Sequence, residues 1–228
     1  MKAFLVESRE IAPNTRHFVF ESPDWNAAFV PGQFVSVTAR IGEDEITRAY
    51  SIVSPPNGGR FELCANLVQH GHLSPMLFGL QSGDEIQFKG PYGAFTLRRP
   101  VSDSIFVATG TGIAPFRSML LSQLSVNAER RFTLIFGVRH EHGLLYHDEF
   151  STLAGEHGNF DYRPTLTRPP EHWAGRTGRV QGYTLEALGD RRDVDIYICG
   201  LREMVDDVRA KLKEIGLDRK RMIYEKYD

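Results

Sequence analysis

Residues 104–117 read SIFVATGTGIAPFR, and this stretch decides the fold of the second half of the chain. A short apolar run, typical of a buried strand, is followed at once by small residues and then by a helical segment. Gly110, Thr111 and Gly112 would let a phosphate approach backbone N–H groups at the positive end of that helix. The third glycine of the G-x-G-x-x-G fingerprint is absent and Pro115 stands at the helix start. By itself, the stretch therefore fits a phosphate loop and a plain tight turn equally well.

The rest of the second half repeats this alternation of strand and helix. Apolar runs predict buried strands, and the segments after them predict helices, which is the pattern of a parallel α/β sheet. The expected strands cover 104–110, 131–138 and 194–200, and the expected helices cover 115–124, 144–154 and 201–216. In the last helix, apolar residues recur at helical spacing and Gly216 stands where the helix would end. These residues are Leu201, Met204, Val205, Val208, Leu212 and Ile215.

The first hundred residues have a different pattern, with short strand-like runs separated by Pro/Gly turns. Their spacing predicts an antiparallel barrel with one short helix over 74–80, where Ser74 would cap the first turn and Pro75 would occupy the first helical position. The expected strands cover 4–10, 17–22, 32–40, 47–54, 59–68 and 84–90. We therefore expect two unlike domains, 1–99 and 100–228, joined near residues 98–103.

Composition excludes several classes of protein. The 228 residues are 41% hydrophobic and 25% charged, which is ordinary for a globular protein. Charge appears within the first seven residues and no apolar run approaches about 20 residues, so we expect neither a signal peptide nor a membrane span, and a cytoplasmic location. Two cysteines far apart in sequence predict no disulfide and no cysteine-ligated iron–sulfur cluster in this chain, and a metal site, which we do not expect, would need other ligands. A net charge of −2 gives no general attraction to nucleic acid or membranes, and we expect a monomer.

The first half carries a second candidate motif, Arg48-Ala49-Tyr50-Ser51. A cation, a flat aromatic ring and a hydroxyl within four extended residues suit a phosphate, a ring face and a ring nitrogen. An edge strand with a surface arginine and a half-buried tyrosine would have the same sequence, and without further context that reading is the better one.

The order of several motifs supplies this context. R-A-Y-S, G-H-L-S, G-P-Y-G-A-F, T-G-T-G-I-A-P-F-R-S, L-L-Y-H-D-E-F, Y-I-C-G-L and E-K-Y occur in one succession. The ordered set resembles the ferredoxin–NADP reductase family over essentially the whole chain. The resemblance implies an antiparallel flavin-binding β-barrel followed by a Rossmann-like parallel α/β nucleotide-binding domain, with FAD and NADP(H) as cofactors.

For the flavin, the resemblance implies that Arg48 holds the FAD pyrophosphate, that Tyr50 stacks on the isoalloxazine ring and that Ser51 hydrogen-bonds near the reactive N5. The remaining implied FAD residues are Ala49, Ala65, Asn66 and Leu67 beside the flavin, and Gly71, His72, Leu73 and Ser74 as a second pyrophosphate segment. The physical reason for this second segment would be a helix N-terminus that offers N–H groups to an anion. For His72, an exposed loop imidazole is the better interpretation, and for Ser74 a simple helix cap is the alternative.

For the nucleotide, the resemblance implies that Gly110, Thr111 and Gly112 meet the dinucleotide and that Cys199, followed by Gly200, lies near the nicotinamide. A lone buried cysteine is usually a core hydrophobe, but this one ends a parallel strand, where open α/β sheets bind ligands. Its role would be alignment, because hydride transfer needs geometry more than covalent chemistry.

The end of the sequence resembles the family's C-terminal signature, in which an aromatic residue covers the flavin face. Tyr227 would be that gate, and Glu225 matches a carboxylate near the site. Plant-type members end on the aromatic residue, whereas this sequence continues to Asp228. A solvated charge in a frayed terminus is an equally good interpretation of Glu225.

The choice between NADPH and NADH depends on a basic cluster for the 2′-phosphate, because a dianion favours guanidinium partners over a ribose-binding carboxylate. Arg139, Arg168 and Arg176, together with Thr167, resemble family positions around that phosphate. We therefore expect NADPH, although three arginines can also be ordinary surface charges.

The sequence thus predicts an oxidoreductase that moves hydride between NADPH and FAD and single electrons to or from ferredoxin or flavodoxin. Candidate basic docking residues are Lys89, Arg98, Arg99, Arg219, Lys220 and Arg221, although a solvated surface charge is the better interpretation of each one alone. One alternative is an NAD(P)H-dependent reductase component of an oxygenase, or a reductase of free flavin. A second alternative is a non-catalytic binding module with the same fold, which would purify without colour.

Overall fold

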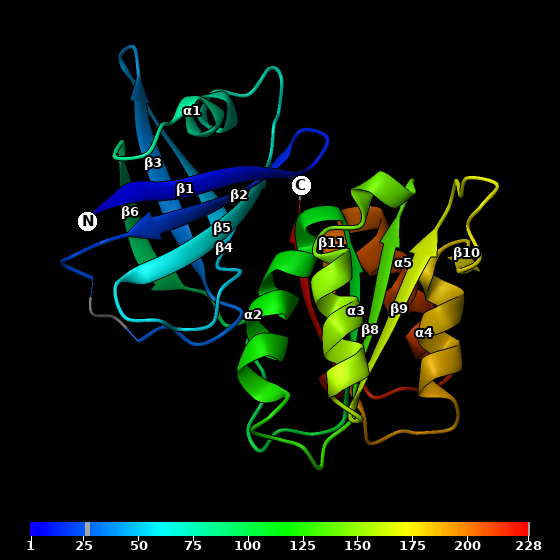
Figure 1. Cartoon of the computed structure of the whole chain (residues 1–228). Helices are drawn as coiled ribbons and strands as arrows, with labels where there is room; N and C mark the ends of the chain where they lie inside the picture. The colour runs from blue at the N-terminus through cyan, green and yellow to red at the C-terminus, as the bar shows by residue number, and fades with distance from the viewer. Residues whose placement is uncertain (26–27, 228) are drawn as a thin grey trace. The chain divides into compact units, whose positions relative to one another are not determined.

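The computed structural model describes residues 1–25 and 28–227, without the side chain of Ile41. The expectation about Asp228 therefore lies outside the described residues. The chain forms two compact units (Figure 1). The first contains Met1–Leu97 and Ala114–Ser122, and the second contains Arg98–Ile113 and Gln123–Asp228.

The first unit is built on a six-stranded antiparallel sheet in the order β4-β3-β6-β1-β2-β5. β4 and β5, at the two ends of this order, also contact each other, and the Ile52–Leu63 bridge extends this contact, so the sheet curls into a barrel. This confirms the predicted antiparallel barrel. The strands are β1 (Lys2–Ala12), β2 (Thr15–Glu21), β3 (Phe34–Ile41), β4 (Asp44–Ser51), β5 (Arg60–Asn66) and β6 (Glu85–Tyr92).

Aromatic side chains fill the inside of this barrel. Trp25 is 1% exposed, and its ring packs edge-to-face against those of Phe61 and Phe88, with ring centroids 4.9 Å and 5.4 Å apart. Such edge-to-face pairs stabilise a core beyond the area that they bury. Helix α1 (Leu73–Gly79) closes one end of the barrel with Leu73 and Leu77, which belong to the same core cluster.

The expected cap at Ser74 is wrong. Helix α1 begins at Leu73, and the N-cap residue, His72, makes no side-chain cap bond. Ser74 is buried, and its Oγ accepts a hydrogen bond from the backbone N–H of Val68 at 2.9 Å. The hydroxyl oxygen of Ser74 therefore fixes the preceding loop and does not cap the helix.

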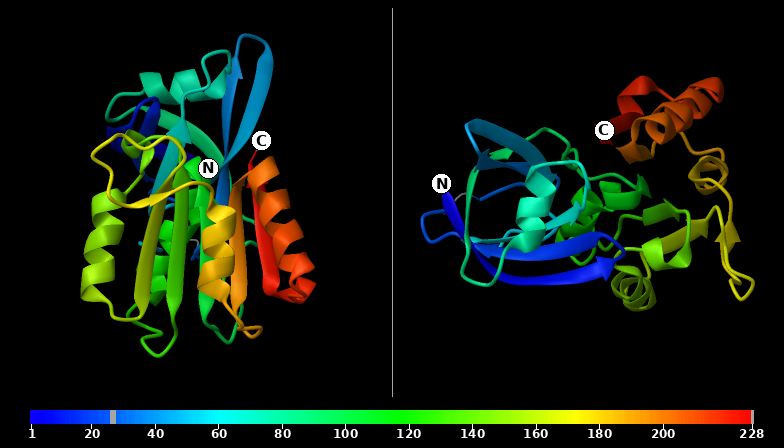
Figure 2. Two further views of the ribbon diagram at one scale, coloured as in Figure 1. Left: turned by 90° about the vertical axis from the view of Figure 1, so that its right-hand side faces the viewer. Right: turned by 90° about the horizontal axis from the view of Figure 1, so that it is seen from above.

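The second unit has six parallel strands in the order β10-β9-β8-β7-β11-β12. The predicted parallel α/β sheet is confirmed. Helices α4 and α5 pack against each other on one face and α3 lies on the other, as right-handed crossovers require (Figure 2). The elements are β7 (Ser104–Thr109), 3₁₀ helix η1 (Gly110–Ile113), β8 (Phe132–Val138), α3 (His147–Glu156), β9 (Phe160–Leu166), β10 (Arg176–Thr177), α4 (Val180–Leu188), β11 (Asp195–Leu201), α5 (Arg202–Glu214) and β12 (Met222–Tyr227).

Most of the apolar residues predicted to line helix α5 are buried in the structure. Met204, Val205, Val208 and Leu212 are buried, as the helical spacing predicted. Leu201 is instead the last residue of β11 and is 63% exposed, so its inclusion in the buried stripe was wrong. Gly216 has a φ of +77°, and the next N–H, from Leu217, bonds to the carbonyl of Leu212, which is the expected glycine helix end.

Helix α2 (Ala114–Gln123) follows η1 directly, and Ala114–Ser122 belong to the first unit by their contacts. None of the helices in residues 1–25 and 28–227 combines the length and apolar character needed to cross a bilayer. In the same residues, Cys64 and Cys199 are buried and are not joined in a disulfide.

Candidate cofactor sites

The candidate flavin residues gather around strand β4. Arg48, Ala49, Tyr50 and Ser51 are consecutive on β4, which contacts β5 and helix α1. The other predicted segments, Ala65–Leu67 and Gly71–Ser74, lie at the end of β5 and the start of α1, so both belong to or adjoin elements of the first unit that contact β4. The exposure falls along the strand, because Arg48 and Ala49 are exposed, Tyr50 is half-buried and Ser51 is buried.

Tyr50 and Arg48 offer complementary chemistry. Burial raises the pKa of the Tyr50 phenol to about 12, against an opposing effect of the Arg48 charge. The phenol therefore stays neutral near pH 7 and presents a flat, uncharged ring. The exposed guanidinium of Arg48 donates one bond, to the carbonyl of Thr47 at 2.8 Å, and its fork suits an anion.

The two neighbouring segments are held mainly by their backbones. Asn66 is exposed and its side-chain oxygen accepts from the hydroxyl of Thr15 at 2.7 Å, and the N–H of Leu67 donates to Asn14 at 2.8 Å. Gly71 N–H donates to the carbonyl of Val68, while His72 is exposed. Ala65 is buried. A ligand beside these segments would meet backbone groups and the hydroxyl of Ser74.

The candidate dinucleotide loop is packed backbone to backbone against strand β11. A Cβ added to Gly112 would lie 2.3 Å from the carbonyl oxygen of Cys199, and one added to Gly200 would lie 2.4 Å from Oγ1 of Thr109. Gly200 also has a φ of +142°, which residues other than glycine rarely adopt. The glycines therefore form a close cradle at the carboxyl ends of β7 and β11.

This cradle contains one polar atom that awaits a partner. Oγ1 of Thr109 is buried and has no hydrogen-bond partner among the described residues. Because buried hydroxyls are normally satisfied, an unpaired one beside a glycine loop fits a site completed by a polar ligand. The unpaired hydroxyl and the glycine loop at a helix start thus fit the chemistry of a nicotinamide dinucleotide. Sequence reasoning missed Thr109, although its position directly before Gly110 is a usable signal.

Cys199, Glu225 and Tyr227 lie together on adjacent strands. Cys199 is in register with Ala108 of β7 and with Glu225 of β12. Burial raises the pKa of the Cys199 thiol, the carboxylate of Glu225 raises it further, and a hydrogen bond from Tyr227 lowers it. Burial also raises the pKa of Glu225. The thiol is therefore protonated near pH 7, which suits packing and alignment and not nucleophilic attack.

The predicted phosphate arginines converge at the same edge of the sheet. The N–H of Arg168 donates to the carbonyl of Arg139 at 2.8 Å, and that of Thr167 donates to Val138 at 3.0 Å, so the loops after β8 and β9 run side by side. Arg176, on β10 beside Thr165, is half-buried with its guanidinium 5.8 Å from the ring of Tyr183.

Two further contacts on these loops were not predicted. His172 and Glu141 form a pair at 2.8 Å, and the rings of His140 and His142 stack at 5.3 Å. No sequence spacing links residues 141 and 172, so these contacts became visible only with the fold.

Several docking candidates have structural partners at the opposite edge of the sheet. Asp195, 2% exposed at the start of β11, pairs with Arg221 at 2.9 Å and Arg98 at 3.8 Å. Arg98 also donates to the carbonyl of Lys220. A buried carboxylate requires such partners, so Arg98 and Arg221 stabilise the unit. Arg99, Arg219 and Lys220 are exposed, and Lys89 lies on β6 of the first unit.

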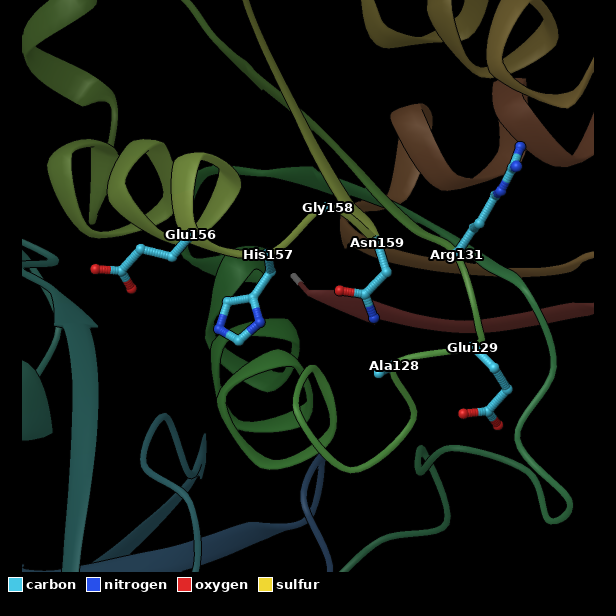
Figure 3. Close-up of a pocket in the computed structure, with 7 residues that line it drawn as sticks. All are labelled: Ala128, Glu129, Arg131, Glu156, His157, Gly158 and Asn159. Carbon is cyan, nitrogen blue, oxygen red and sulfur yellow. The ribbon is translucent and has the colours of Figure 1, made fainter.

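A pocket of about 390 Å³ also lies at the amino ends of β8 and β9 (Figure 3). It is lined by Ala128, Glu129, Arg131, Glu156, His157, Gly158 and Asn159. The amide of Asn159 already donates to three carbonyls, those of Leu124, Asn127 and Arg130. Since open parallel sheets bind ligands at the other edge, this pocket is not the cofactor site.

Comparison with known proteins agrees with both units. Residues 2–97 match the family model of the oxidoreductase FAD-binding domain, and residues 106–210 match that of the oxidoreductase NAD-binding domain. Ferredoxin–NADP reductase B of Sorangium cellulosum is 39% identical, over 100% of this chain and 97% of the relative. The toluate 1,2-dioxygenase electron transfer component of Pseudomonas putida is 32% identical, over 99% of this chain and 67% of the relative.

A solved structure gives the same result. The ferredoxin NADP⁺ reductase from Neisseria gonorrhoeae with bound FAD and NADP superposes with a TM-score of 0.85 at 26% identity, and the match covers 99% of this chain and 98% of that one. The two matched domains, the relative aligned over its whole length and the shared fold together show that the chain belongs to the ferredoxin–NADP reductase family, as an oxidoreductase that uses FAD and NAD(P)H.

Proposed function

We propose that this enzyme takes hydride from NADPH onto FAD and passes single electrons to a small iron–sulfur protein of the ferredoxin type. The observation that supports this most directly is the convergence of Gly112, Cys199, Glu225 and Tyr227 at the carboxyl ends of β7, β11 and β12. The ferredoxin–NADP reductase B relative, aligned over the whole chain, supports the acceptor class. A flavodoxin is a further candidate acceptor, and we propose that the enzyme is a monomer.

FAD, when bound, supplies the ability to take two electrons as hydride and to release them one at a time. In the first unit, we assign Arg48 to the pyrophosphate, Tyr50 to a ring face and Ser51 to a hydrogen bond with the flavin ring. The backbones of Ala65–Leu67 and Gly71–Ser74 would complete the binding surface around β4. This assignment follows the family resemblance and the contacts of β4 with β5 and with α1.

In the second unit, Gly110–Gly112 would hold the dinucleotide and Cys199 would fix the position of the nicotinamide. Because its thiol is buried and protonated, Cys199 offers a small, uncharged wall and not a competing nucleophile. Tyr227 would cover the position that the nicotinamide must take. Glu225, whose pKa is raised by burial, would hold or release a proton beside them.

We further propose a preference for NADPH over NADH. Arg139 and Arg168 lie on adjoining loops, and Thr167 adds a hydroxyl on the second loop. A 2′-phosphate would gain charge-assisted hydrogen bonds there, whereas the 2′-hydroxyl of NADH would gain none. Arg176 stands on the next strand and would contribute from the side. The boundary between the two domains is proposed at residues 99–100, within the gap between the family matches.

The decisive experiment mixes purified, FAD-loaded protein anaerobically with NADPH or NADH and follows the loss of the flavin's visible absorption. We expect fast bleaching with NADPH and slower bleaching with NADH. Arg168→Ala removes one charge-assisted contact, which is worth about 1.5–3 kcal/mol. The variant should therefore bind NADPH at least about tenfold more weakly, while its affinity for NADH stays the same. Arg130→Ala, an exposed arginine at the opposite edge of the sheet, is the control. Protein without flavin, or without bleaching by either nucleotide, would contradict the reductase proposal and favour a binding module.

A second candidate, the reductase component of an oxygenase, is favoured by the toluate dioxygenase relative. The two candidates share hydride transfer and differ in the acceptor. Steady-state reduction of a purified ferredoxin, of a purified oxygenase component and of free FMN, each with NADPH, separates them, and a preference for the oxygenase component would favour the second candidate. A rate with the ferredoxin far above the other two supports the main proposal, while a preference for free FMN would favour a flavin reductase.

A further inference from the structure

Helix α2 presents two buried polar side chains to the barrel. Arg117 is 9% exposed, and its Nη1 donates to the carbonyl of Val53 at 3.0 Å and to Oε2 of Glu62 at 2.8 Å. Ser118 is 0% exposed, and its Oγ donates to the carbonyl of Ser54 at 2.6 Å. All of these residues belong to the first unit. Two consecutive helix residues thus bind two consecutive carbonyls of one strand extension.

That extension, residues 51–54, runs on from β4 and is buried throughout. Its backbone crosses from one strand to another, because Ile52 N–H donates to Gln33 beside β3, and Val53 N–H donates to Glu62 on β5. The hydroxyl of Ser54 accepts from the N–H of Glu62 at 3.2 Å. Gln33 and strand β5 therefore bond the N–H groups of the extension, and helix α2 bonds its carbonyls.

Glu62 pairs with Arg117 beside the extension of β4. Its carboxylate accepts from Arg117 at 2.8 Å and lies 3.5 Å from Nε2 of His17, which is 4% exposed. A largely buried guanidinium needs a carboxylate to offset its desolvation, and here the same guanidinium also bonds the strand. The pair therefore determines where the carbonyl of Val53 lies.

We propose that Arg117 and Ser118 are positioning residues for the flavin, which set the place of Ser51 through their bonds to Val53 and Ser54. The inference rests on the proposed role of Ser51. Ser51 is two residues from Val53 on an extended backbone, so a shift of the extension moves its hydroxyl. Hydride transfer is sensitive to such a shift, because a displacement of about 1 Å can cost up to a hundredfold in rate.

The chain offers a matched control for the loss of a buried serine bond. Ser22 is 1% exposed, and its Oγ donates to the carbonyl of Lys2 at 2.6 Å, the same length as the bond from Ser118. Ser22→Ala and Ser118→Ala therefore remove equivalent bonds from the same unit. If the role of Ser118 were purely structural, Ser118→Ala would change the flavin spectrum and the bleaching rate no more than Ser22→Ala does.

The experiment compares Ser118→Ala, Ser22→Ala, Arg117→Lys and Ser51→Ala in the full-length protein. For each, we measure the denaturant midpoint of the apoprotein, the FAD dissociation constant, the visible absorption spectrum of bound FAD and the rate of bleaching by NADPH. We expect the two serine-to-alanine variants at 118 and 22 to lose similar stability. Only Ser118→Ala should shift the flavin spectrum and slow bleaching, by about tenfold. Arg117→Lys should keep the charge beside Glu62 and most of the stability, but it should slow bleaching because the lysine ammonium does not take the place of Nη1 between Val53 and Glu62.

The results distinguish failure of this inference from failure of the proposed function. If Ser51→Ala changes the flavin spectrum and the rate while Ser118→Ala and Arg117→Lys behave like Ser22→Ala, the positioning role is wrong and the flavin assignment stands. If Ser51→Ala itself has no effect on either property, the proposed role of Ser51 is wrong. A spectral shift and slower bleaching in both Ser51→Ala and Ser118→Ala, but not in Ser22→Ala, support the inference.

Discussion

The two units place their candidate residues in opposite ways. In the barrel, Arg48–Ser51 are consecutive on one strand, on which Arg48 and Ala49 are exposed and only Ser51 is buried. In the α/β unit, Gly112, Cys199 and Glu225 come from three separate segments, and Cys199 is 0% exposed. The barrel therefore offers its chemistry on a finished surface, whereas the α/β unit builds its chemistry into the core.

This difference predicts how each unit responds to substitution. A side chain that projects from a finished strand can be removed with little effect on folding, because it makes few internal contacts. A residue within a packed strand end cannot, because interiors tolerate neither cavities nor added atoms. Binding and stability should therefore separate in the barrel and change together in the α/β unit.

The largest expected effect is that of Gly112→Ala. The added Cβ would lie 2.3 Å from the carbonyl oxygen of Cys199, and this backbone cannot move without separating β7 from β11. We expect a loss of about 3 kcal/mol in the free energy of unfolding, at the upper end for an overpacked core. Urea unfolding of the apoprotein measures it.

Gly182→Ala is the matched control. Gly182 lies in helix α4 and a Cβ there would meet no atom within 4 Å, so the substitution should add about 1 kcal/mol of stability from helix propensity. Equal effects of the two glycine substitutions would mean that the close cradle does not exist in solution.

The second effect concerns the barrel. Arg48→Ala should raise the FAD dissociation constant about thirtyfold, the loss of one or two charge-assisted hydrogen bonds. The stability of the apoprotein should change by less than about 0.5 kcal/mol, because the side chain is exposed. Fluorescence titration of the apoprotein with FAD checks the first value and urea unfolding the second. Arg40→Ala, an exposed arginine on β3, should change neither, and the contrast between the barrel and the α/β unit breaks down if Arg48→Ala unfolds the protein.

The third effect tests whether Cys199 contributes both to the stability of the α/β unit and to the rate of flavin reduction. Cys199→Ala removes a fully buried sulfur and should cost about 1 kcal/mol of stability, within the range for a small core truncation. It should also slow flavin bleaching by NADPH about tenfold, because the nicotinamide loses a wall. Cys64→Ala, in the barrel and 5% exposed, should cost similar stability without slowing bleaching. Equal bleaching rates for both variants would make Cys199 a plain core residue.

The elements that sequence reasoning identified are those whose signals are local. Pro/Gly turns separate the barrel strands, and the long amphipathic pattern marks α5. Helix α4 was missed because its sequence, VQGYTLEAL, contains glycine and poor helix formers, and packing against α5 and the sheet stabilises it instead. Strand β10 was missed because it has only two residues, β9 because Pro164 interrupts it, and β12 because Glu225 and Lys226 break its apolar run.

The same division applies to the candidate sites. Arg48–Ser51 and Gly110–Gly112 are contiguous, so their motifs are visible in the sequence. The bonds from Arg117 and Ser118 span 64 residues to Val53 and Ser54, and no spacing rule links them. The wrong cap at Ser74 has the same cause, because the competing N–H, from Val68, is supplied by the folded loop.

The smallest effect is a pH dependence at Glu225. Burial raises the pKa of this carboxyl above its ordinary value, so the folded protein binds its proton more tightly than the unfolded chain does. Stability therefore falls as pH rises from the unfolded pKa through the raised folded pKa and is constant beyond it. Glu225→Gln cannot ionise and so avoids this loss of stability. The urea midpoint of the variant, relative to that of the wild type, should therefore be higher at about pH 7 than at about pH 4. Glu214→Gln, at the exposed end of α5, is the control. A pH-independent difference between wild type and Glu225→Gln would show that Glu225 is solvated, and the α/β unit would then resemble the barrel in keeping a charge on its surface.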